Sequence, residues 1–318
     1  MEAIILVGGL GTRLRPLTHT IPKPLLPLAN VPMVERMVRK LPDVFDTAIL
    51  AVNYGLTEMK EYFEGKNIGK KIIIVPEEKP LGTGGAMRNC FDYVTGTTAV
   101  FNGDIVSSID LNQMLEQHVQ TKAKGTLALW EVENPSRFGV VKLKNGEILQ
   151  FQEKPEKGTE LSNLINAGTY LLEPEILKMI PPNQKISIER DIYPKIAGNG
   201  LYGFPFEGYF IDSGTPESYL EANFKCIEKD GTAVHKGASI RGPSLIHENA
   251  ELQDCIIGPN AIIGPEVKME KCVVRKSVIL SGVNIYGSVI EDCIVGPNIS
   301  LEKDMNRTLI SPEGEITF

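Results

Sequence analysis

The sequence predicts an α/β protein: a doubly wound, mixed and mainly parallel sheet, followed by a short β-helix of hexapeptide repeats. Apolar runs of strand length alternate with helical patterns over the first two thirds of the chain. Helical periodicity then ends near residue 232, and aliphatic residues recur every six positions behind it. We therefore expect two domains, residues 1–231 and residues 232–318.

The first domain begins with buried strands, each followed by a helix. Four apolar runs are typical of parallel strands covered on both faces. Strands are expected at residues 3–7, 48–52, 72–75 and 99–101, and helices at residues 31–41, 57–63, 84–93 and 111–121. Strand pairs follow in residues 126–151, where Lys144-Asn145-Gly146-Glu147 predicts a hairpin turn. A last helix is expected after Thr215 as its cap and Pro216 in its first turn.

The second domain is predicted from a repeated spacing. Copies of an aliphatic-Gly-Pro tripeptide begin at Ile257, Ile263 and Val295. A six-residue period fits a coil with three short faces, each burying one aliphatic side chain. The side chains expected inside are Ile240, Ile246, Leu252, Ile257, Ile263, Met269, Val283, Val289, Val295 and Leu301. Cys255, Cys272 and Cys293 fall among these repeats and are expected to be small packing residues and not metal ligands.

Composition and charge argue against several classes of function. The chain has 318 residues, of which 42% are hydrophobic and 23% charged, as is usual for a globular protein of more than one domain. Its net charge of −7 argues against a nucleic-acid partner. There are five cysteines without a CxxC pair, no signal peptide and no apolar run of membrane-spanning length. We therefore expect a cytoplasmic protein without membrane attachment.

The stretch IILVGGLGTRLRPLTHTIPKPLLPL, residues 4–28, carries the strongest chemical signal. It lacks the Lys-Ser or Lys-Thr of a P-loop and the third glycine of a dinucleotide-binding fingerprint. It keeps a strand, a glycine-rich turn whose N–H groups can face an anion, and Arg13 directly behind. Lys23 lies between two prolines that stiffen the chain around its charge. On this stretch alone, a phosphate-binding loop and a surface loop with incidental cations both remain open.

Motifs in a fixed order resemble the sugar-1-phosphate nucleotidyltransferases, also called nucleotide-sugar pyrophosphorylases. They are GGLGTRLRPLT with PKPLLPL, Pro80-Leu81-Gly82-Thr83-Gly84-Gly85-Ala86, Asn102-Gly103-Asp104, Glu153-Lys154-Pro155, Asn166-Ala167-Gly168 and Asp212-Ser213-Gly214-Thr215-Pro216. The resemblance covers about residues 3–220 and implies a Rossmann-like nucleotidyltransferase domain. The repeats behind it resemble the left-handed β-helix that many members of this family carry.

The reaction implied by this resemblance is attack of a sugar-1-phosphate oxygen on the α-phosphorus of a nucleoside triphosphate, with release of pyrophosphate. Both reactants are anionic, so catalysis is expected from positioning and electrostatics and not from a nucleophilic side chain. In the resembled family the aspartates matching Asp104 and Asp212 hold Mg²⁺. Each follows a predicted strand, where open α/β sheets bind ligands. The alternative roles are a tight turn for Asp104 and a helix cap for Asp212.

The resemblance also assigns the substrate contacts. Arg13 and Lys23 are expected to neutralise the triphosphate and the departing pyrophosphate, and with the two aspartates they form the predicted catalytic set. The predicted nucleotide-binding residues are Gly8, Gly9, Gly11, Thr12, Arg13, Glu77, Gly82 and Thr83. The predicted sugar-phosphate-binding residues are Gly139, Glu153, Lys154 and Asn166. The alternatives are a solvated surface pair for Glu153 and Lys154, a turn for Asn166 and a strand irregularity for Gly139.

Glu77 bears on the choice of base. Family members that use UTP or dTTP commonly carry a glutamine at this position. A carboxylate only accepts hydrogen bonds, and guanine offers two adjacent donors, whereas uracil and thymine offer one donor between two acceptors. The sequence therefore favours GTP, unless Glu77 points to solvent with Glu78 and Lys79. Residues 165–172 and 187–194 also look more like mannose-1-phosphate guanylyltransferases than like the thymidylyl or uridylyl enzymes.

We thus expect a magnesium-dependent guanylyltransferase that acts on mannose-1-phosphate and forms a homo-oligomer. A first alternative uses UTP or dTTP with glucose-1-phosphate. A second, a regulatory subunit without activity, is disfavoured because such subunits are expected to lose charged site residues that are present here. A third, an acyltransferase in the repeats, would need a histidine base such as His235 or His247 and more coils than residues 232–318 provide. We expect packing, oligomerisation or allosteric contacts from the repeats instead.

Overall fold

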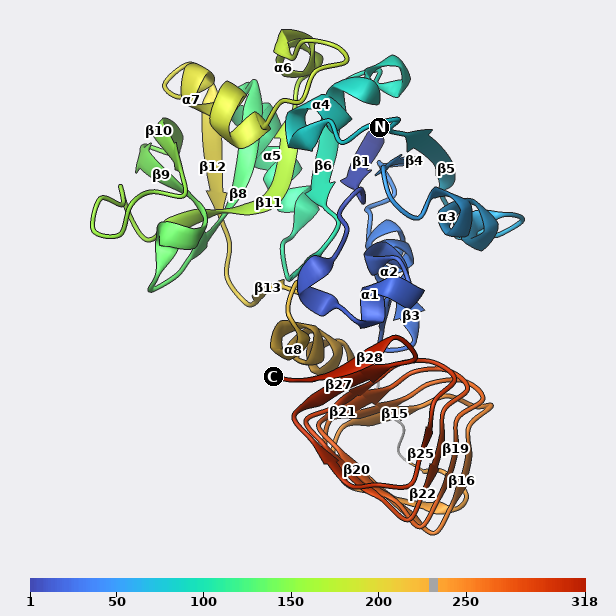
Figure 1. Cartoon of the computed structure of the whole chain (residues 1–318). Coiled ribbons are helices and arrows are strands. Elements are labelled where there is room, and N and C mark those ends of the chain that lie inside the picture. Colours follow the sequence, from blue (N-terminus) through green and yellow to red (C-terminus); the bar gives the residue numbers. More distant parts are fainter. Residues whose placement is uncertain (229–233) are drawn as a thin grey trace. The chain divides into compact units, whose positions relative to one another are not determined.

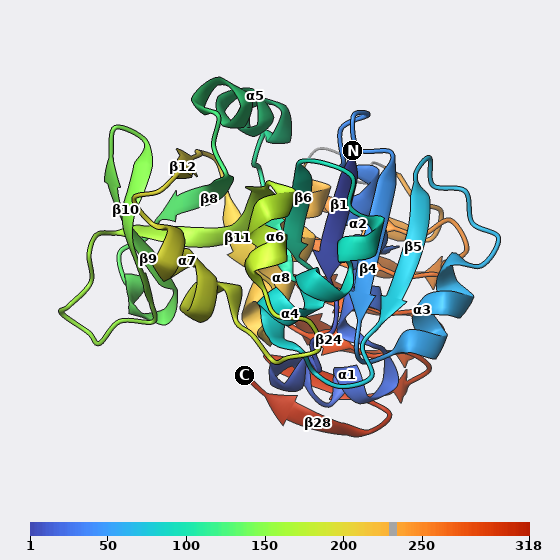
Figure 2. The same ribbon diagram turned by 90° about the horizontal axis from the view of Figure 1, so that it is seen from above.

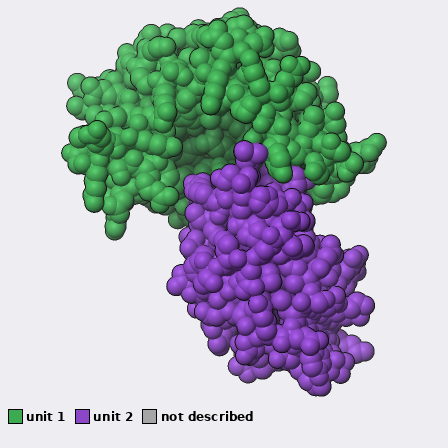
Figure 3. Space-filling view, in the orientation of Figure 1, with its two compact units in different colours: residues 1–9, 37–210 green, residues 10–36, 211–318 purple. Residues whose placement is uncertain are grey.

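A computed structural model describes residues 1–228 and 234–318 (Figure 1). Its contacts divide the chain into two compact units. Unit 1 comprises residues 1–9 and 37–210, and unit 2 comprises residues 10–36 and 211–318 (Figure 3). The glycine-rich stretch near the N-terminus therefore contributes to both units. The domain boundary predicted between residues 231 and 232 lies outside the described residues.

Unit 1 is built on a mixed sheet with the strand order β5-β4-β1-β6-β11-β8-β12-β10-β9 (Figure 2). The bounds are β1 Glu2–Leu6, β4 Thr47–Val52, β5 Lys71–Pro76, β6 Thr98–Asn102, β8 Gly125–Glu131, β9 Gly139–Lys144, β10 Glu147–Glu153, β11 Leu164–Leu172 and β12 Leu201–Pro205. The four strands predicted first are confirmed, and β5, β4, β1 and β6 are parallel. Strand β11 is antiparallel to both β6 and β8, so the antiparallel part of the sheet is larger than predicted.

The helices of unit 1 agree closely with the sequence pattern. The predicted ones are α3 Leu56–Phe63, α4 Gly82–Asn89 and α5 Leu111–Thr121, whereas α6 Pro174–Met179 and α7 Tyr193–Ile196 were not predicted. Helix α2, Met33–Arg39, begins two residues later than predicted, because Val31–Pro32 forms the short strand β3. A residue before proline is disfavoured in the helical region, which explains the extended Val31. The predicted hairpin turn is confirmed between β9 and β10, with Asn145 and Gly146 at φ 52° and 80°.

A large apolar cluster of unit 1 lies on one face of the sheet, where directly paired residues of neighbouring strands point the same way. Ile4, Ile49, Val100 and Tyr170 are fully buried within one apolar cluster, together with Met87 of α4. Each such side chain contributes roughly 1.5–3 kcal/mol by leaving water. This core fixes the strands whose ends carry the polar residues of the site. No helix within residues 1–228 or 234–318 has the length and apolar character needed to span a bilayer.

The C-terminal part of unit 2 is a left-handed β-helix whose short strands stack into three parallel sheets (Figure 1). The first sheet holds β14 Ala238–Ile240, β17 Cys255–Ile257, β20 Val273–Arg275, β23 Val289–Glu291 and β26 Met305–Asn306. The second holds β15 Ser244–Ile246, β18 Ala261–Ile263, β21 Ser277–Ile279, β24 Ile294–Val295 and β27 Thr308–Ser311, with β28 Gly314–Thr317 antiparallel to β27. The third holds β16 Glu251–Gln253, β19 Lys268–Glu270, β22 Asn284–Tyr286 and β25 Ser300–Leu301.

Most of the predicted inward side chains are confirmed. Ile257, Ile263 and Val283 are fully buried, and Cys255, Cys272 and Cys293 share their core as packing residues. Ile240 and Leu252 are only partly buried against it. The prediction for Val289 is wrong, because the side chain is 39% exposed and its neighbour Ile290 is fully buried. The six-residue phase slips by one position between coils, and alternation along the strand then turns Val289 outward.

Steric crowding explains why glycine occupies the middle position of two repeated tripeptides. A Cβ on Gly264 would lie 2.9 Å from the carbonyl oxygen of Ile279 on the next coil. A Cβ on Gly296 would lie 2.9 Å from the carbonyl oxygen of Ile310. Backbone oxygens of a stacked coil cannot retreat without breaking ladder hydrogen bonds, so these corners favour glycine.

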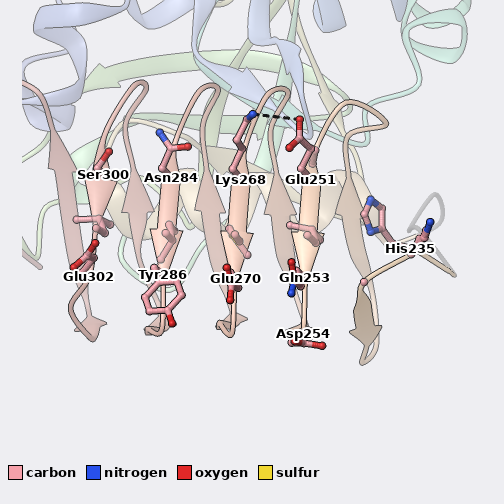
Figure 4. A pocket seen from close by; sticks show the side chains of 17 residues that line it. His235, Glu251, Gln253, Asp254, Lys268, Glu270, Asn284, Tyr286, Ser300 and Glu302 are labelled. Carbon is pink, nitrogen blue, oxygen red and sulfur yellow. Dashed lines mark ion pairs between the residues drawn. The ribbon is translucent and has the colours of Figure 1, made fainter.

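The outer face of the third sheet carries two rows of side chains along the β-helix (Figure 4). One row runs through Glu251 and Lys268, whose charged groups lie 3.3 Å apart, and a second row contains Glu270 and Tyr286. Between them the floor is formed by the middle residues of the strands. His247 lies in the turn before β16, where its Nδ1 accepts a hydrogen bond from the N–H of Asn249. The face is polar and mixed in charge.

Unit 2 also contains segments that are far from the repeats in sequence. They are α1 Leu17–Thr20, β2 Pro27–Leu28, β3, the first part of α2, the end of β13 Phe210–Asp212, and α8 Pro216–Ile227. Helix α8 starts as predicted. Thr215 accepts a hydrogen bond from the N–H of Ser218 and forms a capping box with it, and Pro216 occupies the first turn.

Candidate active site

The parallel strands of unit 1 end at one edge of the sheet, where several predicted site residues follow them. Gly8 comes after β1, Glu77 after β5 and Asp104 after β6. Asn53 follows β4 at the same edge. Because carboxyl ends of parallel strands meet at one edge, this edge is where an open α/β sheet binds ligands.

Gly8 and Gly9 differ in their surroundings. A Cβ on Gly8 would lie 3.1 Å from Cβ of Asn53 and 3.3 Å from Oε1 of Glu77, so protein atoms crowd this position. A Cβ on Gly9 would meet nothing within 4 Å. The free space at Gly9 leaves room for a ligand against the backbone, whereas Gly8 allows Glu77 to approach the strand end.

Glu77 is half-buried, and its carboxylate is held by the protein. Its Oε2 accepts a hydrogen bond of 3.1 Å from the N–H of Leu81, and Oε1 lies alongside Gly8. Glu78 and Lys79 are exposed, so they do not share the environment of Glu77. Burial raises the pKa of the Glu77 carboxyl above its ordinary value of 4.5, and the bond from Leu81 opposes part of this rise. The fixed carboxylate keeps acceptor capacity on Oε1.

The glycines after Leu81 serve close packing at the start of α4. Gly82 has φ 69°, and a Cβ there would lie 2.6 Å from the carbonyl oxygen of Ile186. The N–H groups of Gly84 and Gly85 both donate to the same oxygen, at 2.9 and 3.2 Å. The motif therefore clamps residues 184–188 onto the first turn of α4, a role that its small residues do not reveal from sequence.

Thr83 bonds to the segment that follows Ile186. Its hydroxyl donates to Oε2 of Glu189 at 2.6 Å and accepts from the N–H of Ile188 at 3.0 Å. Ser187 donates a second hydroxyl hydrogen bond of 2.7 Å to the same oxygen of Glu189. Since the Thr83 hydroxyl has one hydrogen, any nucleotide contact from Thr83 would use its remaining lone pair or its backbone.

Asp104 lies in the turn after β6. The preceding Gly103 donates its N–H to the carbonyl oxygen of Leu6 at 3.0 Å, and a Cβ there would lie 2.5 Å from that oxygen. This close approach holds the turn against the end of β1. Asn102 meets a second motif, because a Cβ on Gly168 would lie 2.7 Å from its Nδ2. The Asn-Gly-Asp and Asn-Ala-Gly motifs are thus neighbours in unit 1.

Glu153 and Lys154 form an ion pair, with Nζ of Lys154 3.7 Å from Oε1 of Glu153, but only Lys154 is solvent-exposed. Glu153 ends β10 opposite Gly139, which starts β9 and whose Cβ would lie 3.0 Å from Oε2 of Glu153. The side chain of Glu153 is 15% exposed, and that of Lys154 is 58% exposed. Burial, and next the charge of Glu189, raise the pKa of the Glu153 carboxyl. Lys154 has φ 49°, a strained conformation for a lysine that is typical of functional turns.

Asn166 lies at an irregularity of β11. The register with β8 shifts between Asn166 and Tyr170, and Gly168 has φ 68°. Asn166 accepts a 3.1 Å hydrogen bond from the N–H of Gly168 and donates one of 3.0 Å to the hydroxyl of Tyr170. The turn reading of Asn166 is thus partly right, and one amide hydrogen remains for a ligand.

Sequence reasoning gave no role to Glu189. Its charge is the second cause of the raised pKa of both Glu153 and the buried Tyr170, after burial itself. It therefore lies in the electrostatic range of the predicted sugar-phosphate residues, while two hydroxyls hold one of its oxygens. Its only sequence signal is its place in the family-like stretch of residues 187–194, which carries no periodicity.

In unit 2, Gly11 and Lys23 are packed together. Gly11 has φ 62°, and a Cβ there would lie 2.9 Å from Cγ2 of Thr18 and 3.0 Å from Cβ of Lys23. Thr18 donates its hydroxyl to the carbonyl oxygen of Gly11 at 2.9 Å. Lys23 is only 7% exposed, which is unusual for a lysine and indicates a charge held in place. Thr12, beside Gly11, is exposed.

Arg13 and Asp212 lie together in unit 2. An Nη of Arg13 lies 3.6 Å from Oδ2 of Asp212, and a Cβ on Gly214 would lie 2.3 Å from the same guanidinium group. The Asp-Ser-Gly motif thus provides both the carboxylate and the space for Arg13. The Oδ1 atom of Asp212 is buried, and no hydrogen bond to it is present among the described residues.

The carboxylate of Asp212 has an oxygen that a hard divalent cation would satisfy. A buried oxygen without a partner costs roughly 1–3 kcal/mol, and a cation would satisfy Oδ1 of Asp212. Within residues 1–228 and 234–318 no group of three or more His, Cys, Asp or Glu side chains converges. Mg²⁺ does not require one, since it takes one or two carboxylates and completes its shell with phosphates and water.

Comparisons with known proteins show the family to which the chain belongs. A family model described as nucleotidyl transferase matches residues 2–229, and one described as GMPPB C-terminal domain matches residues 240–310. The mannose-1-phosphate guanylyltransferase of Mycobacterium tuberculosis is 34% identical over 92% of this chain and 83% of that protein. Mannose-1-phosphate guanylyltransferase 1 of Arabidopsis thaliana is 36% identical over 87% and 82%.

Two solved structures show the fold of the nucleotidyltransferase region. HddC from Yersinia pseudotuberculosis, complexed with GMP-PN, is 30% identical with a TM-score of 0.60, covering 71% of this chain and 99% of that chain. A putative glucose-1-phosphate thymidylyltransferase from Bacillus anthracis is 26% identical with a TM-score of 0.64, covering 74% and 98%. Proteins of this family generally use a divalent metal ion. The chain belongs to the nucleotidyl transferase family, as a sugar-1-phosphate nucleotidyltransferase.

Proposed function

We propose that the protein transfers GMP from GTP to mannose-1-phosphate, forming GDP-mannose and pyrophosphate. The observation that carries the choice of base is the fixed carboxylate of Glu77, which accepts from Leu81 and keeps Oε1 beside Gly8. Guanine presents N1–H and its 2-amino group as adjacent donors to such an acceptor. Uracil or thymine would place a carbonyl oxygen against it, and the resulting unpaired acceptors cost roughly 1–3 kcal/mol.

The similar proteins support this base and this sugar. The curated relatives named above act, by their names, on mannose-1-phosphate with a guanylyl group. A similar structure was solved with the guanine nucleotide analogue GMP-PN. Fold alone does not distinguish the base, since a glucose-1-phosphate thymidylyltransferase is similar as well. Glu77 and the whole-chain relatives together therefore favour GTP.

We assign the sugar-phosphate side to Gly139, Glu153, Lys154 and Asn166. Glu153 is buried at the end of β10 and offers acceptors to sugar hydroxyls, while Asn166 keeps one amide hydrogen. Lys154 is more exposed and its ammonium can reach a phosphate. A shielded carboxylate is a suitable partner for sugar hydroxyl groups, because leaving it without a hydrogen-bond donor costs free energy. Glu189, fixed by two hydroxyls, adds a second carboxylate to this region.

We propose that Asp104 and Asp212 hold Mg²⁺, which would bridge the phosphates and stabilise negative charge on the reacting oxygens. Oδ1 of Asp212 has the acceptor capacity that this role needs. Arg13 and Lys23 would neutralise the triphosphate, with Arg13 held at Asp212 and Lys23 buried beside Gly11. Nucleophile and leaving group are both anionic, so these charges contribute by alignment and by screening repulsion.

We propose that the protein works in the cytoplasm. Its five cysteines include no CxxC pair, and a reducing compartment would keep them as thiols. Assembly into a homo-oligomer remains a prediction, which light scattering on the purified protein would test.

The proposed reaction is tested by pyrophosphate release from a matrix of triphosphates and sugar phosphates. GTP with mannose-1-phosphate should give the highest kcat/KM, and chelation of divalent metal should abolish the signal. A higher kcat/KM for UTP or dTTP with glucose-1-phosphate would establish the alternative enzyme. Absence of turnover in every well, from a folded protein supplied with Mg²⁺, would refute catalysis itself.

A further inference from the structure

The segment that carries Gly11, Arg13 and Lys23 packs with the C-terminal part of the chain. Residues 10–36 belong to unit 2, together with α8 and the β-helix, whereas residues 1–9 belong to unit 1 (Figure 3). The cations proposed to bind the triphosphate are therefore supported by elements of unit 2. Two asparagines, Asn30 and Asn223, contribute polar contacts to this packing.

Asn30 links this segment to the β-helix directly. It lies in the tight turn between β2 and β3, where Ala29 and Asn30 have φ 48° and 62°. Its Nδ2 donates a 2.9 Å hydrogen bond to the carbonyl oxygen of Ile263, the last residue of β18. The same oxygen accepts a 2.9 Å bond from the N–H of His247, so both of its lone pairs are used.

Asn223 of α8 holds the same turn from another element. Its Oδ1 accepts a 2.8 Å bond from the N–H of Ala29, and its Nδ2 donates to the carbonyl oxygen of Tyr219 at 2.9 Å. Asn223 is fully buried, so a lost bond would leave a costly unpaired group. The hydroxyl of Tyr219 donates to the carbonyl oxygen of Pro27. The turn is thus bonded to both α8 and the β-helix.

Apolar packing continues this support. Ile262, Val278, Ile294 and Leu309 alternate with the inward residues of the second β-helix sheet, yet each is at most 1% exposed. Within unit 2, α8 contacts β21 and α1 contacts β27, which covers this outer row. Thr18 of α1 in turn bonds the carbonyl oxygen of Gly11. A continuous series of contacts therefore joins the β-helix to the glycine turn.

We propose that Asn30 is a positioning residue for the triphosphate, through which the β-helix takes part in nucleotide binding. The proposal rests on the function proposed above. The bond to Ile263 restrains a turn seven residues after Lys23, and the packing of α1 restrains Gly11. Phosphate alignment is sensitive to small displacements of the charges that make it. The β-helix thus acts as a scaffold for the cationic segment.

The test uses two full-length variants, Asn30→Gly and Asn30→Asp. Glycine keeps the left-handed conformation and removes the amide, and aspartate keeps the shape and removes the donor. Both should raise the KM for GTP by about 3- to 10-fold, the usual range for one lost hydrogen bond. The KM for mannose-1-phosphate should change by less than about twofold. Asn183→Gly is the matched control, since Asn183 is exposed with φ 58° and lies in unit 1.

The outcomes separate the two proposals. An active wild type whose Asn30 variants keep the GTP parameters refutes the positioning role alone. Variants that only melt earlier, or whose kcat falls while the KM values for GTP and for mannose-1-phosphate stay unchanged, also refute it, because a purely structural role predicts this pattern. A folded wild type without activity on any triphosphate refutes the proposed function, and the positioning role falls with it.

Discussion

At the scale of single residues, several charged side chains of the candidate site are shielded from solvent. Glu77 and Glu153 are carboxylates withdrawn from water, and burial is the leading cause of the raised pKa of each. Lys23 is a cation nearly removed from solvent beside Gly11. Burying a charged group destabilises the folded protein, so such groups are expected where they bind charged or hydrogen-bonding substrates.

Asp104→Asn tests the proposed metal role at this scale. The amide keeps the size of the side chain and removes its charge, so we expect kcat to fall by at least about 100-fold, as when a preorganised electrostatic contact is lost. The melting temperature should change little. Asp110→Asn is the control, because Asp110 caps α5 with its side chain and asparagine caps equally well. A large loss of stability in Asp104→Asn would instead assign this residue to folding.

The raised pKa of Glu77 predicts a pH dependence of GTP binding. Guanine needs the ionised carboxylate, so the KM for GTP should rise as pH falls through a pKa above 4.5, and Glu77→Gln should remove that titration. Stability should depend on pH in the opposite direction. The folded state holds this proton more tightly than the unfolded state does, so the contribution of Glu77 to the free energy of unfolding falls as pH rises through the same window. Glu77→Gln should therefore not melt earlier than wild type at neutral pH. A KM for GTP that is flat in wild type down to pH 4.5 would contradict the assignment.

At the scale of elements, glycines in two motifs have different structural roles. Gly85 in α4 has no room for a side chain, because a Cβ would lie 2.5 Å from the carbonyl oxygen of Gln184 and 2.8 Å from Cβ of Leu81. Gly9 after β1 has empty space around it. The first glycine packs one element on another, and the second leaves space at the strand end.

Substitution by alanine at each position should distinguish these two roles. Gly85→Ala should lower the free energy of unfolding by about 1–3 kcal/mol, the cost of overpacking. Gly9→Ala should keep the melting temperature and raise the KM for GTP. Thermal melts and steady-state kinetics on both variants make the comparison. Gly9→Ala with normal kinetics would show that no ligand approaches this backbone closely.

At the scale of the whole molecule, the sequence predicts the architecture well where periodicity is strong. Alternating strand and helix patterns identify β1, β4, β5 and β6, and the six-residue period identifies the β-helix. The misses are local or depend on distant partners. Pro32 diverts Val31 into a strand, the one-residue phase slip turns Val289 outward, and β11 pairs antiparallel with distant strands.

The candidate site shows the same division. Asp104 is found from its place after a predicted strand, and Glu77 from its position in a family-like motif. The bond between Thr83 and Glu189 joins residues 106 positions apart, and that between Asn30 and Ile263 joins residues 233 apart. No local pattern encodes such pairs. For the same reason, the sequence does not predict that residues 10–36 belong to the same unit as the β-helix.

The most direct measurement is the ratio of kcat/KM for GTP to that for UTP and dTTP, with mannose-1-phosphate, in wild type and Glu77→Gln. Glutamine still accepts from the N–H of Leu81, so the fold should survive. Wild type should prefer GTP, and the substitution should lower that preference by about 10- to 100-fold. A wild type that prefers UTP or dTTP, or a preference that the substitution leaves unchanged, would contradict the account.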